Sequence, residues 1–161
     1  MLKVGVLGAG HLGKIHLRLL QQSEKYELVG FYDDNPEYAE KIAAEFGYKR
    51  FTTIATLIHA VDVIDIVTPT LSHYKCARVA IKSGKHVFIE KPISNTIEEA
   101  EEIMALAEEF GVKGQVGHVE RFNPAFIATK GMIQNPMFIE SHRLAEFNPR
   151  GTDVPVVLDL M

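Results

Sequence analysis

The sequence has little cysteine, no tryptophan and no long apolar segment. Its 161 residues include one cysteine, so an internal disulfide is excluded and a disulfide-rich secreted fold is not indicated. The longest apolar runs fall far short of the roughly 18 residues that span a bilayer. Residues 1–4 begin a strand-like run and do not resemble a signal peptide. We therefore expect a cytoplasmic protein with no membrane partner.

An excess of positive charge is also absent. The chain carries 17 basic and 21 acidic side chains, a formal net charge of −4, so a broad contact with a phosphate backbone is not expected and nucleic acid is excluded as a partner. Hydrophobic residues make up 47% and charged residues 24%, which excludes a disordered or collagen-like chain. The length suits one globular domain, or one domain and the start of another.

Short apolar runs alternate with helical patterns through the first three quarters of the chain. The strand-like runs are 2–7, 26–32, 48–51, 62–67, 85–89 and 112–117, and the helical patterns are 11–22, 35–46, 53–60, 72–83 and 96–110. Strands joined by helices run parallel with right-handed crossovers. The predicted fold is therefore α/β, a Rossmann-type doubly wound parallel sheet with helices on both faces.

The helix over 96–110 has the clearest start signal. Thr96 and Glu99 form the pattern of a capping box. Its spacing of apolar residues predicts an inner face made of Ile97, Ala100, Ile103, Met104, Ala107 and Phe110.

The character of the sequence changes after residue 118. Four prolines, at positions 124, 136, 149 and 155, interrupt this part of the chain, and 137–147 reads as a longer strand. We expect a nucleotide-binding domain over 1–118, followed over 119–161 by a linker and the start of a second domain.

A dinucleotide-binding fingerprint follows the first strand. Gly8, Gly10 and Gly13 make the pattern G-x-G-x-x-G, with His11 and Leu12 between the last two glycines. The pattern sits directly between a strand and a helix, where its mechanism needs it. Gly8 allows the tight turn, Gly10 lets a pyrophosphate approach the backbone, and Gly13 permits close packing of helix on strand. The helix N-terminus then offers free N–H groups to the phosphates.

Two aspartates stand where the second strand ends. Asp33 follows Gly13 by 20 residues, the place of the acid that accepts hydrogen bonds from the adenosine ribose. Asp34 adds a second negative charge, and no arginine stands in this turn to meet a 2′-phosphate. The sequence therefore predicts NAD as the cofactor in preference to NADP.

Polar residues also gather where three later strands end. In open parallel sheets the ligand lies at the carboxyl ends of the strands, so we expect these residues at the cofactor site: Thr68, Pro69, Thr70, His73, Glu90, Lys91 and Arg121. Simpler interpretations stay open. Lys91 also fits a solvent-facing lysine at a strand end, His73 a residue near a helix cap, and 118–124 a linker between domains.

Three motifs taken together resemble a known enzyme family. They are Gly8-Ala9-Gly10-His11-Leu12-Gly13, Thr68-Pro69-Thr70-x-x-His73 and Glu90-Lys91-Pro92. They are similar to those of the glucose–fructose oxidoreductase/inositol dehydrogenase (Gfo/Idh/MocA) family, and Glu-Lys-Pro is the most specific. Residues 117–124 and 150–161 resemble a branch that includes UDP-N-acetylglucosamine 3-dehydrogenases, so the resemblance covers the whole chain.

The resemblance implies a two-domain oxidoreductase that transfers a hydride between nicotinamide and a hydroxyl of a sugar or nucleotide sugar. The C-terminal α/β domain then carries the substrate pocket and the interface of a homo-oligomer. The family's lysine maps onto Lys91, where a cation stabilises the developing oxyanion. The aspartate of its Asp-x-x-x-His motif maps onto Asp159, and the histidine is the general base. The Lys91-Pro92 peptide is expected to be cis.

That histidine bears on the length of the chain. It is due four residues after Asp159, but the sequence ends at Met161 in an apolar run. We therefore expect an N-terminal fragment of a longer protein, one that binds NAD and does not turn over substrate.

Two other interpretations compete with that of a dehydrogenase. An NAD-binding sensor or regulatory protein explains the fingerprint, but it needs neither Lys91 nor Asp159. A zinc enzyme has little support, because the seven histidines show no paired ligand spacing and Cys76 stands within a predicted helix. No metal site is predicted, and His16 is interpreted as a helix residue that packs under the phosphate loop.

Overall fold

The computed structural model describes residues 1–132, 134–140, 142, 155 and 157. The strands are β1 (Leu2–Leu7), β2 (Tyr26–Tyr32), β3 (Val63–Ile66), β4 (His86–Glu90) and β5 (Gly114–Gly117). The helices are α1 (His11–Gln21), α2 (Pro36–Phe46), α3 (Ile54–His59), α4 (Thr70–Lys82), α5 (Ile97–Glu109), the 3₁₀ helix η1 (Val119–Phe122) and α6 (Pro124–Thr129). The expected alternation of strands and helices is confirmed.

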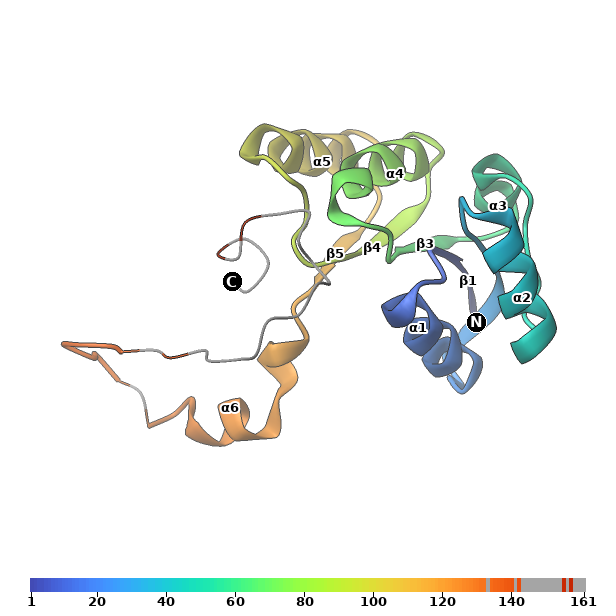
Figure 1. The fold of residues 1–161 in the computed structure, drawn as a ribbon. Helices are drawn as coiled ribbons and strands as arrows, with labels where there is room; N and C mark the ends of the chain where they lie inside the picture. The colour runs from blue at the N-terminus through green and yellow to red at the C-terminus, as the bar shows by residue number, and fades with distance from the viewer. Residues whose placement is uncertain (133, 141, 143–154, 156, 158–161) are drawn as a thin grey trace.

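All five strands are parallel and lie in the order β2-β1-β3-β4-β5 (Figure 1). From β1 the chain crosses to β2 on one side and then returns to β3 on the other side. The direction of winding therefore reverses between β1 and β3. In doubly wound sheets a ligand crevice opens at this switch point.

Two apolar cores fill the two faces of the sheet. On one face, α3, α4 and α5 cover a core that includes Leu57, Ile66, Ile81 and Ile103. On the other face, α1 and α2 cover a smaller core. The alternation of β1 explains the division, because Val6 points into the second core and Leu7 into the first. The doubly wound arrangement predicted from the sequence is confirmed.

Two local expectations are corrected. Residues 48–51 form no strand and make a single bridge between Arg50 and Phe31. Residues 137–140, the described start of the strand expected over 137–147, are not in a strand. Met137 and Phe138 are exposed there, and among the described residues this segment pairs with no strand. Residues 141 and 143–147 lie outside the described residues.

The helix starts and stops mostly follow the sequence signals. The Asn35 side chain accepts a hydrogen bond from the backbone N–H of Tyr38, and α2 ends at Gly47 in the left-handed conformation. Thr96 and Glu99 form the expected capping box of α5. None of the helices in the described part of the chain is long and apolar enough to cross a membrane.

Candidate functional site

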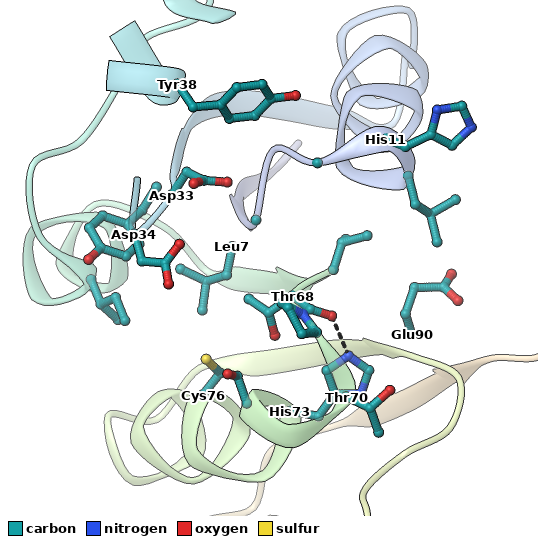
Figure 2. A pocket seen from close by; sticks show the side chains of 18 of the residues that line it. Leu7, His11, Asp33, Asp34, Tyr38, Thr68, Thr70, His73, Cys76 and Glu90 are labelled. Carbon is teal, nitrogen blue, oxygen red and sulfur yellow. Dashed lines mark hydrogen bonds between the residues drawn. The ribbon is translucent and has the colours of Figure 1, made fainter. Parts of the chain in front are cut away.

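A pocket of about 900 Å³ opens at the carboxyl ends of β1, β2, β3 and β4, at the switch point of the sheet (Figure 2). It brings together most of the residues that the sequence singled out, namely Gly8, Gly10, His11, Leu12, Asp33, Asp34, Thr68, Pro69, Thr70, His73, Glu90 and Lys91. These residues come from four separate strand ends. The fold therefore makes one site of motifs that lie far apart in the sequence.

The three glycines of the loop meet three different steric demands. Gly8 has φ of +92°, and a Cβ there would lie 2.6 Å from the carbonyl oxygen of Val67. A Cβ on Gly13 would collide with the carbonyl oxygen of Gly8. A Cβ on Gly10 would meet no atom of the described chain within 4 Å, so its backbone faces open space. Glycine at Gly10 therefore leaves room for a ligand.

The start of α1 is prepared for an anion. Gly10 is its N-cap, and no side chain of the described residues caps the first turn. The first N–H groups of a helix have no partner within it, and the helix dipole places partial positive charge there. This open helix end fits the pyrophosphate of a dinucleotide.

Asp33 is tied to the glycine loop. Its Oδ2 accepts a hydrogen bond from the N–H of Ala9 at 2.8 Å, and its Oδ1 accepts one from the N–H of Asn35 at 3.0 Å. Each carboxylate oxygen has a further lone pair for a ribose hydroxyl. Asp34 is exposed beside it. The Tyr38 hydroxyl donates to the carbonyl oxygen of Ala9 at 3.1 Å, so it braces the same loop.

His73 connects two of the strand ends. It is 2% exposed, with Nε2 at 2.9 Å from the carbonyl oxygen of Thr68 and Nδ1 at 2.8 Å from that of Pro92 (Figure 2 shows the first contact). In either neutral tautomer, one of these contacts is a hydrogen bond donated to a carbonyl. His73 therefore ties the loop after β3 to the turn after β4, a larger role than that of a residue near a helix cap.

Lys91 begins the turn after β4. It lines the pocket, and its N–H donates to Glu90 Oε2 at 3.0 Å. The Lys91-Pro92 peptide is cis, which confirms the expectation from the resemblance.

A buried charge cluster lies directly below this turn. His16 Nδ1 is 2.8 Å from Asp65 Oδ2, and His16 Nε2 is 3.4 Å from Glu90 Oε1. Burial by itself lowers the pKa of His16, but the hydrogen bonds and charges of Asp65 and Glu90 outweigh it and raise the pKa to about 9. Burial raises the pKa of Asp65. Burial also acts to raise the pKa of Glu90, but His16 and the Lys91 N–H lower it overall.

The raised pKa of His16 predicts a loss of stability at alkaline pH. His16 stabilises the fold fully below its unfolded pKa of 6.5, and this contribution falls as the pH rises through about 9. The free energy of unfolding should decrease across this window by at most about 3 kcal/mol. Urea unfolding at a series of pH values measures it. A His16→Gln variant should show a flatter profile, and an equally steep decline in that variant would assign the effect to other groups.

Of the predicted site residues that the structure describes, Gly13 and Arg121 do not line the pocket. Arg121 lies exposed in η1 and does not line the pocket, because the chain turns into a 3₁₀ helix after β5. Asp159 lies outside the described residues, as does Arg143. Among the residues that the structure describes, no group of three or more His, Cys, Asp or Glu side chains is arranged to hold a metal ion.

The sequence did not single out several residues that shape the site. Tyr38 and Ile54 line the pocket, but their sequence pattern predicts only that they belong to helices. Asp65 stands in a run of β-branched residues that reads as an ordinary buried strand. An aspartate inside such a run was itself a signal, because a buried carboxylate needs a partner.

Comparisons with known proteins agree with this geometry. The model of an oxidoreductase family with an NAD-binding Rossmann fold, GFO_IDH_MocA, matches residues 2–118. The UDP-N-acetylglucosamine 3-dehydrogenase of Acidithiobacillus ferrooxidans is 37% identical over 99% of this chain and 51% of its own length. The glucose-6-phosphate 3-dehydrogenase of Bacillus subtilis is 33% identical over 84% of this chain and 39% of its own length.

Solved structures give the same picture. One structure of the Acidithiobacillus ferrooxidans enzyme has a TM-score of 0.89 and 36% identity over 98% of this chain and 52% of that chain. GenD2 from gentamicin A biosynthesis, solved in complex with NAD, has a TM-score of 0.76 and 26% identity over 81% of this chain and 38% of that chain. The present chain thus spans about half the length of the Acidithiobacillus ferrooxidans enzyme and less than half that of the Bacillus subtilis enzyme.

Proposed function

The chain belongs to the Gfo/Idh/MocA family of oxidoreductases with an NAD-binding Rossmann fold, and from this premise we propose that the protein is an NAD-dependent dehydrogenase of a nucleotide sugar. UDP-N-acetylglucosamine is the proposed substrate, supported by the 37% identity to a 3-dehydrogenase of that compound. The observation that carries the proposal is the pocket itself. It presents an open helix end and Asp33 on one side and Lys91 on another.

The residues of this chain have distinct proposed roles. The N–H groups at the start of α1 hold the pyrophosphate, and Asp33 accepts hydrogen bonds from the adenosine ribose. When bound, NAD supplies the acceptor of the hydride. The Lys91 ammonium stabilises the negative charge that develops on the sugar oxygen as its proton leaves. His73 and Glu90 hold the turns on either side of that position.

We also propose that residues from 119 onward belong to a second domain. Every described residue from 118 to 142 is exposed, including large apolar side chains at Phe122 and Met132. Large exposed apolar side chains in one segment are typical of a part of the chain that packs against another unit. Within that domain Asp159 is the proposed partner of a catalytic histidine. Arg121 remains a candidate cofactor contact from the linker.

For the complete protein we propose a cytoplasmic homo-oligomer that takes small-molecule substrates. The net charge of −4 supports the exclusion of nucleic acid as a partner. The oligomer rests on the family resemblance alone, and sedimentation of the complete protein tests it.

The proposed reaction is tested with the complete protein, NAD and UDP-N-acetylglucosamine. We expect reduced cofactor to accumulate in proportion to oxidised sugar. Glucose 6-phosphate and inositol serve as competing substrates, since relatives carry the names of their dehydrogenases. Tight NAD binding without reduction by any of these compounds would instead indicate an NAD-binding regulatory protein.

The cofactor preference depends on Asp33. Replacing Asp33 by alanine is expected to weaken NAD binding about tenfold and to abolish the preference for NAD over NADP, because a carboxylate there binds ribose hydroxyls and repels a 2′-phosphate. Isothermal titration with both cofactors measures it. Asp34→Ala is the matched control, because it removes the same charge one position later without the bonds to Ala9 and Asn35. Stronger binding of NADP than NAD by the unmodified protein would contradict the assignment.

A further inference from the structure

His16 touches three side chains from two different strands. It lies on α1, the helix whose start faces the pocket. Its ring contacts Asp65 on β3 and Glu90 at the end of β4, and it meets the ring of Phe88 edge-on with centroids 5.9 Å apart. The imidazole is 15% exposed, and each carboxylate is 7% exposed. The ring therefore has little freedom, and it links the glycine-loop helix to both strands beneath the pocket.

The Glu90 carboxylate carries this contact onward to Lys91. Oε1 faces His16, while Oε2 accepts the N–H of Lys91 at 3.0 Å. The same Oε1 also lies close to β5, because a Cβ on Gly117 would lie 2.6 Å from it. Glu90 thus sits in a slot between α1 and β5. Its carboxylate is therefore bonded to the first backbone N–H of the turn that carries Lys91.

The cluster depends on the positive charge of His16. Two carboxylates that share a buried site repel each other and cannot both stay ionised without a cation between them. Without His16, Glu90 would take up a proton or turn toward solvent, and either change weakens its bond to the Lys91 N–H. The Lys91 backbone would then shift, and with it the side chain that lines the pocket.

We propose that His16 is a positioning residue, which acts through Glu90 to fix the turn that carries Lys91 at the nicotinamide end of the pocket. The inference rests on the proposed function only in that it assigns this end of the pocket to nicotinamide. It adds a role for a residue that does not line the pocket. The role concerns one half of the cofactor and leaves the adenosine half, held by the glycine loop and Asp33, unchanged.

This division gives a test that does not depend on turnover. ADP-ribose carries the whole of NAD except nicotinamide, so its affinity reports on the adenosine half alone. In the His16→Gln variant we expect the affinity for NAD to fall about fivefold and that for ADP-ribose to stay within about twofold. With substrate, kcat should fall further than KM for NAD rises. His59→Gln, the same substitution at an exposed position of α3, should change none of these values.

A role in stability alone predicts a different pattern. Equal weakening of NAD and ADP-ribose, or a lower Tm with both affinities unchanged, would overturn the proposal. If the protein binds NAD but none of the tested sugars reduces it, the proposed reaction is wrong. The comparison of NAD with ADP-ribose would still test the positioning role of His16.

A second variant covers the possibility that His16→Gln does not fold. The pair His16→Leu with Asp65→Leu replaces two buried charges by apolar side chains of similar size, an exchange that proteins often tolerate. The repulsion from Asp65 is gone in this protein, but Glu90 still loses its cation, and burial of an unpaired carboxylate alone favours its protonation. The selective loss of NAD affinity should therefore persist, and a ratio of NAD to ADP-ribose affinity equal to that of the unmodified protein would refute the positioning role.

Discussion

Replacing Lys91 by methionine is expected to reduce kcat about 10²- to 10³-fold while the Kd of NAD rises no more than about tenfold. Methionine keeps the length and apolar stem of lysine but carries no charge. The developing negative charge on the sugar oxygen then has no cation beside it, so the transition state loses stabilisation that the bound ground state never had. Steady-state kinetics of the complete protein, together with titration of NAD, separates the two effects.

The matched control for this variant is Lys82→Met. Lys82 is exposed at the end of α4, and its replacement should leave both kcat and Kd unchanged. Lys91→Arg should retain a larger share of the activity, because the cation remains although its geometry differs. A Lys91→Met protein with nearly full activity would remove Lys91 from the catalytic step and return it to the interpretation of a solvent-facing lysine.

Replacing Gly13 by alanine is expected to have the second large effect. Its Cβ would collide with the carbonyl oxygen of Gly8. No side-chain rotation can relieve this clash, because one atom is a backbone oxygen and the other is bonded directly to the backbone, so α1 and the glycine loop must separate. Overpacking of this kind costs about 1–3 kcal/mol of folding stability. The displaced N–H groups also lose charge-assisted bonds to phosphate, which corresponds to about 10²-fold weaker NAD binding.

Gly10→Ala is the informative comparison. Its added Cβ would meet no atom of the described chain within 4 Å, so the free energy of unfolding should stay near that of the unmodified protein. NAD binding should still weaken, because the methyl group occupies space needed by the pyrophosphate. Thermal unfolding and NAD titration of both variants check this contrast. A Gly13→Ala protein with unchanged Tm would show that the loop accommodates the methyl group.

The parts of the site that the sequence could predict are the parts encoded by neighbouring residues. Gly8, Gly10 and Gly13 lie within one turn between a strand and a helix, so their spacing alone indicates a phosphate loop. Asp33 follows from counting along a single βαβ unit. The element order was accessible for the same reason, because apolar periodicity and caps such as Thr96 act within a few residues.

The charge cluster was not accessible in this way. His16 and Asp65 are 49 residues apart, and their contact depends on the register of three parallel strands. Nothing local distinguishes His16 from a helix residue packed under the loop. The sequence contained one hint, the carboxylate of Asp65 within a buried strand, but it did not identify the partner.

The inner face of α5 shows a second limit. Ile103 is buried as predicted, but Ile97 and Met104 are 74% and 64% exposed, and Leu106 is buried without having been predicted. Periodicity gives the arc of a helix that is apolar, whereas the neighbours decide which part of that arc is covered. Because α5 packs beside α4, the side of α5 that is buried does not coincide with the centre of its apolar face.

The order of the strands also determines which parts of the domain can open separately. β1 and β3 are each hydrogen-bonded on both sides, whereas β2 and β5 form the two edges. The edge strands can detach in partial openings, but the three inner strands, β1, β3 and β4, lose their backbone bonds only when the sheet as a whole comes apart. The glycine loop leaves β1, and the loop of Thr68 leaves β3. We therefore expect the amide hydrogens of β1 and β3 to exchange slowly, so that the glycine loop and the loop of Thr68 keep their positions through smaller fluctuations, whereas Asp33 follows an edge strand.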